Sequence, residues 1–267
     1  MRCEYPVRIL VARGVCQSEL GKLRDNRVGW GLSWWRVSGN ADLQGSDCPK
    51  QRTSLAMYLP PHFQELNPDI ISQIVATAPL ACIVAQTSEG LVANHIPVLA
   101  KGRDTLIGHV ALANDMHRLM ADGPPVLAIF RGDHGYISPN YYPTKALHHR
   151  HVPTWNYQVV HMHGTISFQH DTRSKRAVVG LLTRHHEQGL NGDAAWRMAD
   201  APADYMAQML DNIVAFQITV TRILAKSKLS QNREPIDGQG AADGVRASGQ
   251  VALAEHMVQR LADKREG

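Results

Sequence analysis

The sequence has no long apolar run, and this absence excludes the commonest kind of membrane anchor. Of the 267 residues, 44% are apolar, but no window approaches the roughly 18 consecutive apolar residues of a membrane-spanning helix. The N-terminus also lacks the basic, apolar and small-residue succession of a secretory signal. We therefore expect a globular protein that is not exported.

Cysteine is scarce, and the four cysteines include no Cys-x-x-Cys pair. Cys3, Cys16 and Cys48 lie in the first 56 residues, which leaves only Cys82 for the rest of the chain. A disulfide framework is therefore not expected, and this usage fits a reducing cytoplasm.

Several signatures of nucleotide binding and catalysis are also missing. The chain contains no G-x-G-x-x-G, no G-x-x-x-x-G-K-[ST], no HExxH and no G-x-S-x-G. These absences argue against Rossmann-type or P-loop nucleotide binding, against a zinc protease site and against a serine nucleophile.

Charge is distributed unevenly. Residues 1–56 hold nine Lys and Arg against five Asp and Glu, which accounts for the whole net charge of +4. Residues 57–267 hold nineteen of each sign and all fourteen histidines. Because non-specific DNA binding depends on clustered Lys and Arg, this neutral part, which has no recognisable helix-turn-helix, is by composition a poor DNA binder.

Residues 1–56 show neither a sustained helical period nor a sustained strand period. We expect this segment to be a disordered or non-native extension, and the folded protein to begin at Met57. Deleting it is then expected to leave thermal stability and ligand binding unchanged.

From Met57 onward, short apolar strands alternate with turns at spacings typical of a barrel. Asn67 and Pro68 mark the start of a helix, as a cap followed by proline at the first helical position. Strands are expected at 80–87, 91–100, 105–110, 126–130, 153–169 and 214–223, and helices at 70–77, 115–121, from 171 onward, 204–212 and 240–264. The pattern predicts a mainly β fold, a six- or seven-stranded antiparallel barrel with flanking helices over 57–233. Residues 234–267 would be a helical segment that packs on the barrel or on a partner chain.

Two segments place polar side chains at strand positions. Asn94 and His95 stand just before Pro97, which removes a hydrogen-bond donor from the ladder. The segment is either an edge bulge with a satisfied histidine or a bulge that presents its groups to a ligand. His109 ends the next strand and Asn114 opens a helix, whose free N–H groups would suit a phosphate unless the helix is simply capped.

A third segment is dense in aromatic and hydrogen-bonding groups. Tyr136 and Ser138 lie in a Tyr-Ile-Ser-Pro run, and Lys145 follows a few positions later. This mixture holds flat heteroaromatic ligands by stacking and placed polar contacts. Lys145 would either meet a phosphate as a point charge or remain a solvated loop residue.

The long strand that begins near residue 153 carries the same mixture. Thr154, Trp155 and Asn156 supply a hydroxyl, a large ring and an amide, which a purely structural strand does not need. The polar segment 226–233, after the last strand, would either clamp a phosphate or form a solvated end. Its candidate binding residues are Lys228, Ser230 and Gln231.

The histidines do not predict a metal site. His148, His149 and His151 are neighbours in one loop, and adjacent side chains diverge, whereas metal ligands must converge. His161 and His163 share one strand face but have no evident acidic partner.

Taken in order, these segments resemble the PaiB-type family of FMN-binding negative transcriptional regulators. The segments that carry the resemblance are Met57-Tyr58-Leu59-Pro60-Pro61-His62-Phe63, Ala93-Asn94-His95-Ile96-Pro97, Gly108-His109-Val110-Ala111-Leu112-Ala113-Asn114, Tyr136-Ile137-Ser138-Pro139, Val152-Pro153-Thr154-Trp155-Asn156-Tyr157 and Lys228-Leu229-Ser230-Gln231-Asn232-Arg233. The chain departs from the family pattern at Gly132-Asp133-His134-Gly135 and at Asn140-Tyr141-Tyr142.

The resemblance implies an FMN-binding split β-barrel, usually a homodimer with FMN near the dimer interface. It also implies repression of bacterial genes for protease production and sporulation, or of similar targets, and hence a regulator rather than an enzyme. Two further hypotheses remain open. The same barrel could be a flavin-dependent oxidoreductase, or the histidines could serve a haem- or metal-binding barrel.

Overall fold

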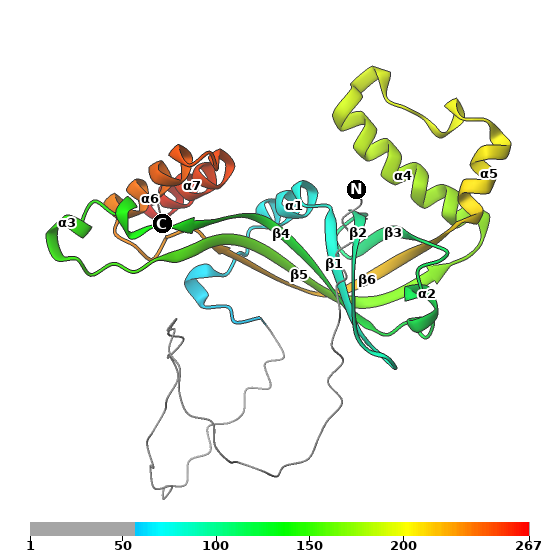
Figure 1. The fold of residues 1–267 in the computed structure, drawn as a ribbon, viewed down its shortest axis with the longest axis horizontal. Helices are drawn as coiled ribbons and strands as arrows, with labels where there is room; N and C mark the ends of the chain where they lie inside the picture. The colour runs from blue at the N-terminus through cyan, green and yellow to red at the C-terminus, as the bar shows by residue number, and fades with distance from the viewer. Residues whose placement is uncertain (1–56, 267) are drawn as a thin grey trace, which may run out of the picture. The chain divides into compact units, whose positions relative to one another are not determined.

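A computed structural model describes residues 57–266, so the expected extension 1–56 lies outside the described residues. Six antiparallel strands close into a barrel in the order β1-β2-β3-β6-β5-β4 (Figure 1). Their bounds are β1 (Leu80–Thr87), β2 (Gly90–Ala100), β3 (Thr105–Ala111), β4 (Pro125–Ile137), β5 (Thr154–Gln169) and β6 (Ile213–Lys228). The prediction of an antiparallel barrel with flanking helices is confirmed, with six strands.

The helices flank the barrel in separate groups. They are α1 (Pro68–Thr77), α2 (Met116–Leu119), α3 (Lys145–His148), α4 (Thr172–Asn191), α5 (Ala203–Asp211), α6 (Pro235–Ala247) and α7 (Val251–Glu266), with short 3-10 turns at Pro61–Phe63, Pro139–Tyr141, Gly192–Ala194 and Met198–Asp200. Helix α4 contacts β3 and β6, whereas α6 and α7 contact each other and β4 (Figure 1). Helix α1 begins as predicted, because the Asn67 side chain accepts a hydrogen bond from the Asp69 amide at 2.9 Å.

Two strands run further than the sequence predicts. β4 continues through Gly132 to Ile137, because a β-bulge between Arg131 and His134 absorbs the irregular residues without ending the ladder. β6 continues past residue 223 to Lys228, so the first part of the polar segment 226–233 is strand.

The C-terminal part contains two helices where one was predicted. α6 begins at Pro235 and ends before Gly249, whose φ of +88° is unfavourable for other residues. A second core lies here, formed by α6, α7 and the strand ends, with Ile137, Tyr142 and Leu229 at its centre.

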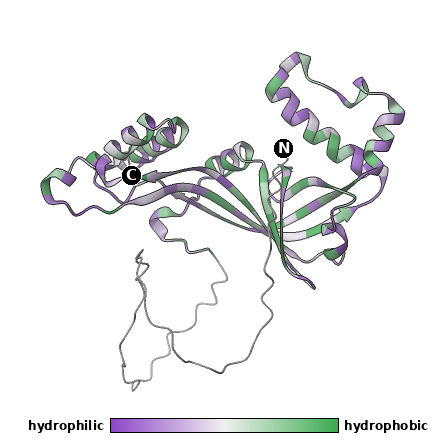
Figure 2. Cartoon of the chain, viewed as in Figure 1, coloured by the Kyte–Doolittle hydropathy of each residue, from purple (hydrophilic) through white to green (hydrophobic). Residues whose placement is uncertain are grey.

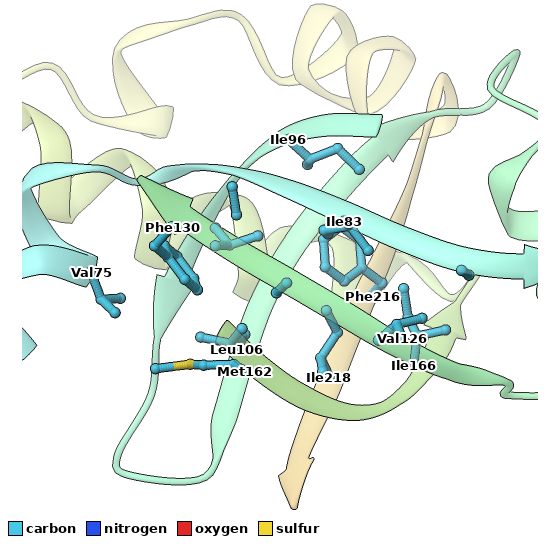
Figure 3. Close-up of a cluster of buried hydrophobic side chains, with 14 of the residues drawn as sticks. Val75, Ile83, Ile96, Leu106, Val126, Phe130, Met162, Ile166, Phe216 and Ile218 are labelled. Carbon is cyan, nitrogen blue, oxygen red and sulfur yellow. The ribbon is translucent and has the colours of Figure 1, made fainter. Parts of the chain in front are cut away.

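The main core fills the barrel, where alternate residues of the strands point inward. Phe130, Phe216, Ile83 and Ile218 are fully buried there (Figure 3). Colouring by hydropathy shows the same alternation along the strands (Figure 2). None of the helices within 57–266 is both long and apolar enough to cross a membrane.

Candidate functional site

The outer face of β4, β5 and β6 gathers aromatic and basic side chains from distant parts of the chain. Register pairs Tyr136 with Trp155, and it pairs Tyr157 with both His134 and Lys228. Directly paired residues lie on the same face of a sheet. We call this set the outer-face cluster: Arg131, His134, Tyr136, Trp155, Tyr157, Lys226 and Lys228.

Trp155 is the centre of the aromatic part of this cluster. The His134 ring stacks on it with centroids 6.2 Å apart, and the Tyr136 ring meets it edge-on, also at 6.2 Å. Both large rings remain about half exposed, Trp155 at 53% and Tyr136 at 48%. An open cavity of about 470 Å³ adjoins them, lined by Met57, Ile129, Arg131, His134, Trp155, Tyr157, Val159 and His161.

Lys228 supplies positive charge beside these rings. Its Nζ donates to the Thr154 hydroxyl and to the Trp155 carbonyl, each at 2.5 Å. Burial, together with the nearby charges of Lys226 and Arg233, lowers the pKa of the Lys228 amine. An anion bound beside Lys228 would offset both the burial of the ammonium group and its repulsion by the neighbouring positive charges.

Lys226 is buried, with only 5% of the residue exposed. Its Nζ donates to the Tyr58 carbonyl at 3.1 Å and faces the rings of Tyr58, Phe63 and Tyr157 at 5.3, 6.0 and 5.3 Å. Among the side chains of residues 57–263, no carboxylate forms an ion pair with Lys226 or Lys228. The outer face therefore carries two neighbouring basic side chains without a carboxylate partner among residues 57–263.

Three of the predicted binding residues lie beneath this face instead of on it. The Asn156 amide donates to the Ser230 hydroxyl at 2.8 Å, and both residues are buried. Gln231 accepts from the Leu229 amide at 2.7 Å and donates to the Ser227 carbonyl at 2.6 Å. These bonds fix the turn that follows Lys228, so direct ligand contact by these three residues stays a prediction.

A second group of predicted residues forms a separate cluster at the other side of the barrel. The Asn114 amide donates to Asn94 Oδ1 at 3.1 Å, and Asn114 Oδ1 accepts from the Met116 amide at 2.9 Å. The expected cap is therefore present, but α2 has only four residues and a correspondingly small dipole. His95 is exposed on β2.

His109 lies on β3 with an incompletely satisfied ring. Its Nδ1 is buried and has no hydrogen-bond partner within the described chain. Burial lowers the pKa of the imidazole, so the ring is neutral near pH 7. A neutral ring nitrogen without a partner can still bond to a ligand that brings a donor or an acceptor.

The two clusters are too far apart to touch one small ligand within a single chain. Asn94 pairs with Ile83, and Ile83 pairs with Ala128, so Asn94 lies level with Ala128 across the sheet. Trp155 lies level with Tyr136, its partner on β4. From Ala128 to Tyr136 the strand advances by roughly 25 Å at about 3.3 Å per residue. A typical small-molecule pocket of 300–1,000 Å³ is only about 8–12 Å across.

The remaining predicted residues belong to the connection between β4 and β5. The Ser138 hydroxyl accepts from the Asn140 amide at 3.2 Å, and Lys145 donates to Asn140 Oδ1 at 2.5 Å. Both interactions stabilise the loop. The described residues contain no group of three His, Cys, Asp or Glu side chains placed to hold a metal ion.

The residues predicted to bind a ligand did not include Arg131, His134 and Tyr157 of the outer-face cluster. Tyr157 could have been found, because strand alternation from Trp155 places it on the same face. Lys226 lies in the segment 226–233 that was predicted either to clamp a phosphate or to form a solvated end. Its burial against Tyr58 and Phe63 could not be predicted, since these residues are far away in the sequence.

The chain is similar to several known proteins in sequence and to solved structures in fold. The chain is 28% identical over 211 residues to "Protease synthase and sporulation protein PAI 2" of Bacillus subtilis, covering 78% of this chain and 98% of that protein. It is 26% identical over 226 residues to the uncharacterised protein AN0679 of Emericella nidulans, covering 71% and 88%. A solved structure described as a "putative 5-nitroimidazole antibiotic resistance protein" from Bacteroides thetaiotaomicron superposes with a TM-score of 0.46 at 14% identity, covering 61% of this chain and 85% of that one.

Residues 57–222 match the family described as "Putative FMN-binding domain". This segment begins at Met57, where the sequence pattern becomes that of a folded domain, and it includes all six strands except the end of β6. The match and the barrel agree with each other, and the chain belongs to this FMN-binding domain family.

Proposed function

We propose that this protein binds FMN with the outer-face cluster, its ring system against Trp155 and Tyr136 and its phosphate toward Lys228. The observation that carries the proposal is the pair Lys226 and Lys228, two cations without a carboxylate partner in the described chain, next to a half-exposed tryptophan. Flat anionic ligands need this combination of ring surface and fixed positive charge.

We further propose that the flavin site is completed by a second copy of the chain. Asn94, His109 and Asn114 cannot reach a flavin held at Trp155 of the same chain, because the clusters are separated by roughly 25 Å of strand. In a two-fold symmetric homodimer, the group Asn94, His109 and Asn114 of one copy can face the outer-face cluster of the other copy. The exposed outer face, with Trp155 at 53% exposure, is then an interface.

For the cellular role we propose a cytoplasmic regulator whose FMN acts as a sensor. The relative PAI 2 carries a name that refers to protease synthesis and sporulation. The neutral charge of residues 57–267 makes direct DNA binding the least supported part of this role. The alternative is an FMN-dependent oxidoreductase, because bound flavin supplies hydride and electron transfer.

Flavin titration tests the proposal directly. The full chain should bind FMN, with a shift in the visible spectrum, and should bind riboflavin much more weakly, because riboflavin lacks the phosphate. Lys228→Met should lower FMN affinity by about tenfold or more and leave riboflavin affinity unchanged. Lys101→Met, at an exposed turn, is the matched control. Failure to bind FMN, or equal loss of both ligands, would refute the assignment.

The two roles make different predictions for the loaded protein. Rapid reduction of bound FMN by a nicotinamide cofactor, with turnover, favours the oxidoreductase. Retarded migration of promoter DNA that depends on flavin state favours the regulator. A Soret band in place of a flavin spectrum would favour a haem-binding barrel.

A further inference from the structure

A second cavity, of about 500 Å³, opens at one end of the barrel beneath α1 and beside the turn between β2 and β3. It shares no lining residue with the cavity at Trp155. Its volume lies within the range of small-molecule sites, and the mouths of β-barrels are common positions for them.

The inner wall of this cavity is apolar. Val75, Val98, Leu106, Met162 and Ala225 line it, and each is less than 7% exposed. Figure 3 labels three of them, Val75, Leu106 and Met162. The buried charged side chain in the lining, Glu65 at 3% exposure, is paired with Arg260, so the rest of the wall suits an aliphatic or aromatic body. Its burial would contribute roughly 0.8 kcal/mol per methylene, which corresponds to about fourfold in affinity.

The rim carries the polar groups. Arg103 is exposed at the turn between β2 and β3, and its guanidinium has no ion pair or hydrogen bond to residues 57–263. The Glu65 carboxylate already has partners, because it is paired with Arg260 and accepts a hydrogen bond from the Asn67 amide at 3.0 Å. Asp69 lies in the first turn of α1, where the helix dipole offsets its charge. Arg103 is therefore the Lys or Arg side chain of the cavity lining, and it has no ion-pair partner within residues 57–263.

We propose that the barrel mouth is a second binding site, for a small amphiphilic acid. The apolar body enters between α1 and β6, and the carboxylate stays at the rim near Arg103. The site does not depend on the flavin site, since it uses different residues at a different part of the barrel.

A homologous series of ligands tests the cavity. Hexanoate, octanoate and decanoate are titrated into the full chain by calorimetry, with decanol and decylamine as partners of different head group. We expect affinity to rise about three- to fourfold per methylene until the cavity is filled, and decanoate to bind more tightly than decanol or decylamine. Affinity independent of chain length, or no binding of any member, would overturn the site.

Two variants with matched controls test the location. Ala76→Trp places a large ring at the mouth from an exposed position on α1, and should weaken decanoate at least tenfold. Gln73→Trp carries the same ring on the same helix outside the cavity lining and should bind as the wild type. Because both substituted positions are exposed, the fold is expected to tolerate them.

The head group is tested separately. Arg103→Gln should weaken decanoate about fivefold and leave decanol unchanged, since only the acid uses the charge at the rim. Lys101→Gln, a neighbour that does not line the cavity, is the control. Tighter binding of decylamine than of decanoate, or an equal effect of Arg103→Gln on acid and alcohol, would overturn the assignment of an acidic ligand. Wild-type affinity in Ala76→Trp would overturn the location.

Discussion

Lys226 shows how one residue can cost stability and serve binding. Its charge is buried among three aromatic rings with a single hydrogen-bond acceptor, the Tyr58 carbonyl. Cation–π contacts offset part of the desolvation penalty, but replacing a buried charge by an apolar side chain of similar size is often neutral or stabilising. A methionine in its place would keep the contacts with the rings.

We therefore predict opposite effects of Lys226→Met on stability and on binding. The free energy of unfolding without ligand should rise by about 1 kcal/mol, because no uncompensated charge remains. FMN affinity should fall about tenfold, because the anion loses a cation. Urea unfolding and flavin titration measure the two quantities. A large loss of stability would show that the ammonium group is essential to the fold.

Histidines make the stability depend on pH in a defined direction. Burial lowers the pKa of His109 and of His163, and burial together with the neighbouring His163 lowers that of His161. A histidine with a lowered folded pKa stabilises the protein fully above its unfolded pKa of about 6.5 and less as pH falls through the folded pKa. These side chains therefore favour unfolding in acid.

We expect the wild type to lose stability between pH 7.5 and pH 5, measured by urea unfolding at each pH. In His109→Phe, which cannot be protonated, this loss should be smaller. His170→Gln, at an exposed position, serves as the comparison. If His109→Phe kept the full wild-type loss, His109 would not be one of the groups responsible.

At the scale of elements, glycines fix how closely strands approach. A Cβ at Gly164, beside the bulge between β5 and β6, would overlap the Thr219 carbonyl oxygen, which belongs to backbone and cannot rotate away. A Cβ at Gly189 in α4 would meet nothing within 4 Å. At Gly164 a larger residue is therefore excluded by a steric clash, whereas at Gly189 alanine would change only the helix propensity.

Gly164→Ala should destabilise the protein by about 1–3 kcal/mol through overpacking. Gly189→Ala should stabilise it by roughly 0.5–1 kcal/mol, because alanine reduces the entropy of the unfolded chain and favours helix. Thermal and urea unfolding of the two variants measure both effects. Equal changes of the same sign would contradict the distinction.

Elements with a clear period could be predicted from the sequence, whereas those that depend on pairing could not. The strand 80–87 stands out as a short apolar run and the strand 153–169 by its interleaved apolar and polar residues, and the observed bounds differ by at most one residue. The predicted strand 126–130 is shorter than β4 because Gly132-Asp133-His134-Gly135 has the composition of a turn, and only pairing with β5 keeps this segment in the sheet. The site was predicted in part for the same reason. Trp155 and Lys228 could each be predicted as candidate binding residues, but their contact could not, because they are 73 residues apart in the sequence.

At the scale of the whole molecule, the two clusters set a requirement on assembly. Asn94, His109 and Asn114 lie near β2 and β3, whereas Trp155 and Lys228 lie on the extended part of β5 and β6 (Figure 1). The barrel is one closed sheet, so no bending within it brings these positions together. If both clusters bind one flavin, they belong to different copies of the chain.

Mixed dimers can test this requirement. Asn114→Ala and Trp155→Ala should each bind little FMN alone, because each homodimer has both of its sites damaged. When the two variants are co-expressed, half of the randomly formed dimers are mixed. In a mixed dimer one site takes both damaged clusters and the other takes both intact ones, so about one quarter of the wild-type flavin content should return. If the sites were built within single chains, each chain would carry one damaged site, and mixing would restore nothing.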